Sequence, residues 1–590
     1  MIYKRYRLFG SALCMSLALL ATSCSMSDDM ECPPDPAGGG TGKAYIQLSF
    51  RMADAQGTRA NPNGGENGDG NEAGQGYENK IEDAVAFLFN GNETANGAAT
   101  TLVTPVYFST VTPNPDDTHY VTETKQADVE TGEYNLIVVA NPGDHWWETI
   151  SPLNLHEVRD HIQKTAWKTN TNADGTTTYT DFLMSSAAEP TQKLNLENSS
   201  ADDPATTTVS VERMAARVDY RAENSYHCTD PTYTGATVEI AGATIINNFN
   251  AGSYLLKRVA GYADVNPEGE ENVKYLGDET SENTIATNYV IDPWTKLKTA
   301  GNADLSLTPF PVDGQGVNAE GLYVAGTYLP TGSDNPEDWS NAVKAGTTVE
   351  DPTTNEKWQR VGYTLENTTA YLETAKTYNT GIVFKAKFHP QGVEDYTQGC
   401  TFFTYNDIIY SSLTKMVGSL NGHKDDFVQF ISDNVSGKTV AEAKAFAETL
   451  ADDPAGYYDY LHTLADDAQQ VYTWTEYLLN VLGVDETDVT NPQINKGGIE
   501  TRAELYDRSN RIVRTYYNGE CYYIWWLRHS NDGDDETNGV MEYATVRNNI
   551  YKVDVKSIYS LGGDIPDSED IRATVYVNKW VMLGEETLPM

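Results

Sequence analysis

The stretch AYIQLSFRM, residues 44–52, decides the fold, because apolar and polar side chains alternate along it without a break. One set of alternate residues is apolar: Ala44, Ile46, Leu48, Phe50 and Met52. The other set is more polar: Tyr45, Gln47, Ser49 and Arg51. A period of two is typical of a strand with one buried face. The sequence therefore predicts a half-buried strand at residues 44–52.

The residues after this strand predict an exposed connection. Residues 61–76 are almost wholly Gly, Asn, Glu, Asp and Pro with few apolar side chains, a composition that cannot bury a core and is typical of a linker. Arg59 is the only Lys or Arg between Arg51 and Lys80. We therefore expect Arg59 to be accessible to other proteins.

Composition limits the fold class and the partners. The chain has 590 residues, of which 39% are hydrophobic, so we expect two or more domains with cores of their own. Its 37 tyrosines and many Asn, Asp and Gly turn residues favour a mainly β protein. With 85 acidic and 41 basic residues the formal net charge is -44, which argues against nucleic acid as a partner.

The amino terminus predicts export. Basic residues in positions 4–7 precede the apolar stretch LFGSALCMSLALLA and the small residues TSC that end at Cys24. This is the pattern of a secretory signal at residues 1–23, and the residues around Cys24 resemble a bacterial lipobox, whose cysteine receives the lipid. The alternative is an ordinary signal peptide with an incidental cysteine. Beyond the signal, we expect no segment that spans a bilayer.

Further runs predict two β domains, at residues 60–225 and 226–590. Strand-like runs lie at residues 84–90, 134–141, 206–222, 236–249, 321–330, 379–390 and 521–530. A short helix is expected at residues 155–167, and apolar spacing of three and four predicts a helical insertion at residues 405–482. Cys228, Cys400 and Cys521 are too few and too far apart for a disulfide framework.

Motifs for catalysis, metals and cofactors fail on spacing. His156 and His161 are five residues apart, whereas the zinc motif HExxH needs a step of four. The acidic stretch at residues 532–539 lacks the glycine and the distal glutamate of a calcium loop, so it reads as a hairpin loop. We expect no cofactor and no enzymatic activity, and a surface glycan-processing enzyme remains the least favoured reading.

The last strand-like stretch, residues 571–583, can be interpreted in two ways. Its apolar set is Ile571, Ala573, Val575 and Val577, and its opposite set is Arg572, Thr574, Tyr576 and Asn578. It follows a turn-rich segment, so it could pair with another subunit as a donor strand. Alternatively, it closes the sheet of its own domain, in which case its removal would destabilise the monomer.

Several motifs resemble a known family. These are VSVERMAARV (209–218), AGTYLP (325–330), TGIVFKAKFHP (380–390), CYYIWWLRH (521–529) and ATVRNNIYKVDVKSIYSLG (544–562). In this order they are similar to the shaft (major) subunits of the type V fimbriae of Bacteroidia, in the short or minor fimbria family. The linker at residues 61–76 and the insertion at residues 405–482 depart from that pattern.

The resemblance implies a lipoprotein precursor with two β-sandwich domains of transthyretin-like, Greek-key character. It implies a propeptide at residues 24–59, palmitate or a similar lipid on Cys24 at the outer membrane, and cleavage between Arg59 and Ala60 by an arginine-specific protease. Strand 44–52, with Ile46, Leu48 and Phe50, would then be removable, and residues 571–583 would be the donor strand. The expected partners are identical subunits, anchor and tip proteins, in a fimbrium that supports adhesion and biofilm formation. A tip or accessory adhesive lipoprotein of the same fold is the alternative.

Overall fold

The computed structural model describes part of the chain, and all statements below concern that part. The described residues are 44–52, 71–94, 97–114, 119–172, 177–187, 194–246, 252–260, 274–275, 289–293, 343, 345–351, 354–368, 379–405, 407–411, 441, 513–529, 542–564 and 570–581.

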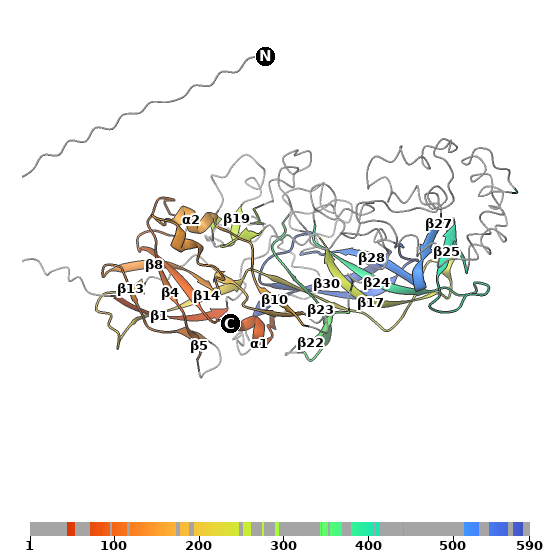
Figure 1. Cartoon of the computed structure of the whole chain (residues 1–590), viewed down its shortest axis with the longest axis horizontal. Coiled ribbons are helices and arrows are strands. Elements are labelled where there is room, and N and C mark those ends of the chain that lie inside the picture. The colour runs from red at the N-terminus through yellow and green to blue at the C-terminus, as the bar shows by residue number, and fades with distance from the viewer. Residues whose placement is uncertain are drawn as a thin grey trace, which may run out of the picture. The chain divides into compact units, whose positions relative to one another are not determined.

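The first sheet has ten strands, drawn in red to yellow in Figure 1. In spatial order, eight of them are β4 (Thr104–Phe108), β3 (Ala84–Asn90), β8 (Glu133–Ala140), β12 (Met184–Ser186), β14 (Ala205–Arg213), β1 (Ala44–Met52), β6 (Tyr120–Thr122) and β5 (Val111–Pro113). Two short strands pair outside this order: β13 (Leu194–Asn195) with β8, and β7 (Lys125–Ala127) with β1. Pro105 lies in the edge strand β4, where a missing backbone donor costs little.

A second group of strands forms a sandwich of two sheets. The six-stranded sheet has the order β2 (Asn71–Ala73), β30 (Ile571–Val581), β29 (Asn549–Ile558), β15 (Ala216–Arg221), β23 (Lys357–Thr364) and β22 (Thr347–Glu350). The four-stranded sheet has the order β16 (Tyr226–His227), β17 (Thr237–Ile246), β24 (Gly381–His389) and β28 (Glu520–Trp526).

The remaining elements are short. Small ladders join β10 (Lys168–Thr171) to β11 (Thr177–Thr180), β9 (Ile162–Gln163) to β18 (Ser253–Tyr254), β19 (Arg258–Ala260) to β20 (Lys274–Tyr275) and β21 (Tyr289–Ile291), and β25 (Phe402–Tyr405) to β26 (Ile408–Tyr410) and β27 (Val513–Tyr516). The described helices are α1 (Gly76–Asn79), η1 (Trp146–Thr149), α2 (Leu155–Asp160), η2 (Pro231–Tyr233) and η10 (Tyr517–Gly519).

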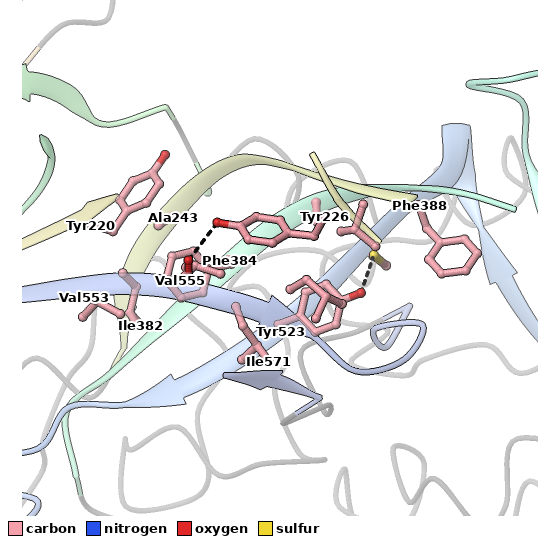
Figure 2. Close-up of a cluster of buried hydrophobic side chains, with 14 of the residues drawn as sticks. Tyr220, Tyr226, Ala243, Ile382, Phe384, Phe388, Tyr523, Val553, Val555 and Ile571 are labelled. Carbon is pink, nitrogen blue, oxygen red and sulfur yellow. Dashed lines mark hydrogen bonds between the residues drawn. The ribbon is translucent and has the colours of Figure 1, made fainter. Parts of the chain in front are cut away.

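One apolar core lies between the six-stranded and four-stranded sheets. Figure 2 shows Val553, Val555 and Ile571 of the six-stranded sheet together with Phe384 and Tyr523 of the four-stranded sheet. The Tyr226 hydroxyl donates a hydrogen bond of 3.0 Å to the Val555 carbonyl across this core. Apolar side chains from facing sheets therefore hold these two layers together, as in a β-sandwich.

Another core lies on one face of the ten-stranded sheet and continues into the six-stranded sheet; we call it the first core, and the core between the six-stranded and four-stranded sheets the sandwich core. Its buried members from the first sheet include Leu48, Leu88 and Val138. Trp580 of β30 and Ile550 of β29 belong to the same cluster. Strand β30 thus contributes to both cores, because Ile571, Val575 and Val577 lie in the sandwich core.

The mainly β fold class is confirmed, but several expected bounds were wrong. The run 206–222 is two strands in different sheets, β14 and β15, and the domain bounds 60–225 and 226–590 stay predictions. The helix expected at residues 155–167 ends at Asp160, and the strand expected at residues 521–530 ends at Trp526. Residues 408–410 form a strand rather than the start of a helical insertion, and nearly all of 412–482 lies outside the described residues, as does the strand expected at 321–330.

Candidate functional site

The strand expected to be removable is confirmed as a strand and lies inside the first sheet. Along β1, the side chains of Ala44, Ile46, Leu48 and Phe50 are all 0% exposed. The residues between them are partly buried, so the alternation of the sequence appears as a buried face and an outer face. The Leu48 side chain and its neighbours therefore fill a continuous part of the first core.

Strand β1 also has hydrogen-bonded neighbours on both sides. It runs parallel to β14 from the pair Ile46–Ala205 to the pair Met52–Val211, and antiparallel to β6 and β7. The Leu48 amide donates to the Thr122 hydroxyl oxygen at 2.9 Å. If β1 left, a groove with two open strand edges and an apolar floor would remain.

The residues expected to carry lipidation and cleavage lie outside the described part of the chain. These are Cys24, Arg59 and Ala60. The described chain ends at Met52 and resumes at Asn71, so residues 53–70 are the covalent connection between β1 and everything that follows it. A single cut in this connection would make β1 and the rest of the sheet separate chains.

The expected donor strand is confirmed as a strand, and here it lies in its own subunit. Strand β30 pairs antiparallel with β29 from the pair Ile571–Ile558 to the pair Lys579–Asn549. Ile571 and Val575 are 0% exposed and Val577 is 2% exposed, within the core of the same chain, whereas Ala573 is only partly buried. This is the arrangement that the closing-strand alternative requires.

A cluster of buried charged residues lies where β30 ends. We name it the junction cluster; its members are Glu72, Glu78, Arg213, Arg217, Asp219, Asp351, Tyr363, Lys552 and Trp580, each at most 5% exposed. Charged groups are seldom buried unless they are paired, because burial removes their hydration. In this cluster they are paired, as the following contacts show.

Arg217 is shared by three carboxylates. Its guanidinium donates to the Asp219 carboxylate at 2.8 Å and 3.0 Å, to the Glu78 carboxylate at 3.1 Å, and to Glu72. Burial raises the pKa of Asp219 to about 6, against the opposing effect of the positive Arg217, and the negative Glu72 raises it further. The protonated form of Asp219 is therefore more favoured in the folded chain than in the unfolded chain.

Two further cations complete the junction cluster. The Lys552 ammonium lies 2.5 Å from a Glu72 oxygen and 3.0 Å from an Asp351 oxygen. The Arg213 guanidinium donates to the carbonyls of Trp580 at 2.9 Å and Glu78 at 3.0 Å. It also lies 4.4 Å from the centre of the Trp580 ring, in the geometry of a cation–π contact. The cluster thus joins β2, α1, β14, β15, β23, β29 and β30.

Sequence reasoning gave these residues no role. Arg213 and Arg217 belong to the stretch 209–218 and Lys552 to the stretch 544–562, two of the motifs that carry the family resemblance. The available signal was the presence of charged residues within apolar, strand-like runs, since such residues need buried partners. Those partners could not be named, because Arg217 and Glu78 are 139 residues apart in the sequence.

Within the described ranges, no group of three or more His, Cys, Asp or Glu side chains is placed to hold a metal ion. Over the same ranges, no helix has the length and apolar character needed to cross a membrane. The three described cysteines, Cys228, Cys400 and Cys521, are free.

Two family models match the chain. Residues 45–243 match the major fimbrial subunit protein (FimA) family, and residues 514–585 match the carboxyl-terminal family of the major fimbrial subunit protein type IV, fimbrillin. The first match begins at β1 and the second ends beyond β30. No curated protein matches the chain.

Solved structures of low similarity cover most of the chain. A protein described as a cell adhesion protein of Parabacteroides distasonis is 13% identical, with 91% of this chain and 100% of that chain covered and a TM-score of 0.36. A fimbrilin of Porphyromonas gingivalis is 10% identical, with 92% and 99% covered and a TM-score of 0.33. The tip fimbrial protein Mfa3 of Porphyromonas gingivalis is 9% identical, with 91% and 100% covered and a TM-score of 0.30.

The matched models describe subunits of a cell-surface fimbrium, which are structural or adhesive proteins and not enzymes. Such subunits assemble with other fimbrial subunits. The matches over residues 45–243 and 514–585 support a fimbrial structural or adhesive subunit.

Proposed function

We propose that this chain is a shaft subunit that polymerises when another subunit's strand replaces β1. The observation that carries the proposal is the position of β1 in the first sheet. It is an interior strand with a fully buried apolar face, yet the rest of the fold follows it through the connection 53–70. Arg59 lies in that connection and is its only Lys or Arg.

The contacts of β1 contribute enough stabilising free energy to drive assembly when another strand makes them. Burial of Ile46, Leu48 and Phe50 contributes about 1.5–3 kcal/mol for each side chain, and each ladder hydrogen bond adds about 0.5–1.5 kcal/mol. After a cut, β1 is held without a covalent link and can dissociate. An incoming strand of similar pattern recovers the same contacts by strand addition, and a head-to-tail contact of this kind builds a fibre.

Export and processing come before assembly in this proposal. The signal at residues 1–23 directs the precursor to the outer membrane with lipid on Cys24, and an arginine-specific protease cuts between Arg59 and Ala60. The support is the sequence pattern around Cys24 and the isolated arginine between β1 and β2. The mature subunit then begins at Ala60 and joins identical subunits, together with anchor and tip proteins, in a surface fimbrium.

The proposed donor role of residues 571–583 requires that β30 first lose contacts in its own chain. For residues 571–583 to fill the groove of a neighbour, β30 must leave β29 and withdraw Ile571, Val575 and Val577 from its own core. Ala573 would move with them. The neighbour's groove offers a comparable apolar floor, so the exchange replaces one buried environment by another.

Arg59→Ala tests the proposed processing, with Arg51→Ala as a matched control on the exposed end of β1. Each precursor is treated with an arginine-specific protease and run unboiled on a denaturing gel. We expect a ladder and an amino terminus at Ala60 for the wild type and Arg51→Ala, and neither for Arg59→Ala. A ladder from Arg59→Ala would contradict the proposal, and a single band from the cut wild type would favour a tip or accessory subunit.

A further inference from the structure

The segment formed by β2 and α1, residues 71–79, lies beside the end of the carboxyl-terminal strand. We call it the latch segment. Strand β2 is parallel to β30, with the pairs Asn71–Lys579, Glu72–Trp580 and Ala73–Val581. It is also the first described segment after the connection 53–70. The two ends of the described chain beyond β1 therefore meet in one ladder.

Buried ion pairs fix the latch segment to the interior of the six-stranded sheet. Glu72 is 1% exposed and binds Arg217 and Lys552, and it accepts a hydrogen bond of 3.3 Å from the Asn578 amide of β30. Glu78 is 0% exposed and binds Arg217 and the Tyr363 hydroxyl. These partners belong to β15, β23, β29 and β30.

The latch segment also covers the side chain of Trp580. The Trp580 ring is stacked on Tyr363, with ring centres 5.9 Å apart and an interplanar angle of 9°. A Cβ atom at Gly74 would lie 2.5 Å from the indole nitrogen of Trp580. Gly74 thus permits a close approach of the backbone to Trp580 that a larger residue would prevent.

We propose that the latch segment holds β30 in its own sheet and stays in place when the connection 53–70 is cut. Within the part of the chain that the structure describes, its hydrogen bonds and ion pairs are made with β14, β15, β22, β23, β29 and β30, and none is made with β1. The departure of β1 therefore removes none of them directly, although β14, which holds Arg213, is a ladder neighbour of β1. Opening of the groove and release of the terminal strand are then separate events. The biological meaning of this separation rests on the proposed strand exchange, but the contact itself can be tested in the uncut monomer.

The experiment measures amide hydrogen exchange in the uncut full chain. Glu72→Gln combined with Glu78→Gln removes both negative charges of the latch segment. We expect exchange in residues 571–581 to become at least about tenfold faster, with exchange in residues 44–52 unchanged, because local opening frees only the elements that lose contacts.

Glu366→Gln is the matched control, since Glu366 is also 0% exposed and is paired at 2.5 Å with a buried arginine, Arg547. It should leave exchange in residues 571–581 unchanged. Rescue is tested by adding Asn71→Cys and Lys579→Cys to the double variant, because a disulfide at this pair of the ladder would restore slow exchange.

Three results would contradict the proposal that the latch segment holds β30 in its own sheet. These are unchanged exchange of residues 571–581 in the folded double variant, equal acceleration throughout the chain, or the same acceleration in Glu366→Gln. If the double variant does not fold, Gly74→Ala takes its place, since the added Cβ displaces the latch segment from Trp580 without a change of charge. Unchanged exchange of β30 in Gly74→Ala would then refute the proposal. Because the uncut chain is used, a failed ladder experiment would not affect these outcomes.

Discussion

Leu48→Ala should make β1 leave much faster once the connection 53–70 is cut. Leu48 is 0% exposed in the first core, and truncation of a buried leucine to alanine costs about 2–5 kcal/mol. A factor of ten corresponds to about 1.4 kcal/mol, so the lower value predicts release about 30-fold faster if the loss is expressed in the dissociation rate. The uncut variant should also have a lower melting temperature than the wild type.

The assay follows the fragment that carries β1 after protease treatment, by size-exclusion chromatography at successive times. Ser49→Ala is the control, because Ser49 lies on the outer face of the same strand and is only partly buried. It should release β1 at close to the wild-type rate. Equal release rates for Leu48→Ala and the wild type would refute the argument that side-chain burial holds β1 after the cut.

Three further predictions concern other parts of the molecule. Cys24→Ser should abolish incorporation of a labelled fatty acid into the precursor, and retained label would show that the lipobox assignment is wrong. Val575→Asp should lower the melting temperature of the monomer, because Val575 is 0% exposed in the core of its own chain and burial of a charge costs several kcal/mol. An unchanged melting temperature would show that β30 lies outside that core in solution. The pKa of Asp219 is raised to about 6 in the folded chain. Between about pH 4 and pH 6 the folded chain therefore binds more protons than the unfolded chain, and the contribution of Asp219 to the free energy of unfolding falls as the pH rises. Asp219→Asn should therefore gain stability relative to the wild type from pH 4 to pH 7, by up to about 3 kcal/mol, in urea unfolding at each pH; a constant difference would contradict the raised pKa.

The strands with one buried face could be predicted closely from the sequence. The run 44–52 has the bounds of β1, because its alternation matches the burial of every second side chain. The run 84–90 is likewise β3. In such strands the pattern of the sequence and the pattern of burial have the same period, so no information from distant residues is needed.

Changes of sheet and ends of helices were harder to predict. Between β14 and β15, Met214 and Ala215 are both buried, and no Gly or Pro marks the point where the chain passes from one sheet to the other. In α2, Asn154 caps the helix by accepting a hydrogen bond of 3.1 Å from the Glu157 amide. The helix ends at Asp160 because the chain then forms β9, whose partner β18 is about 90 residues away.

The pairing of the terminal strand could not be decided from its sequence. The alternation from Ile571 to Val577 fits a closing strand and a donor strand equally well, since both bury the same side chains. The alternation shows that these side chains are buried, but it does not show whether the surface that covers them belongs to the same subunit or to another. Trp580 breaks the expected alternation after Lys579, and in the structure its ring lies in the first core rather than in the sandwich core.

The two unlike neighbours of β1 have a consequence for the fibre. Because β14 runs parallel to β1 while β6 and β7 run antiparallel to it, an incoming strand that restores these ladders can enter the groove in one direction only. Under the proposed exchange, every subunit would then point the same way. The filament would have two chemically different ends, one with an empty groove and the other with an uninserted strand, so that extension and termination would take place at different ends.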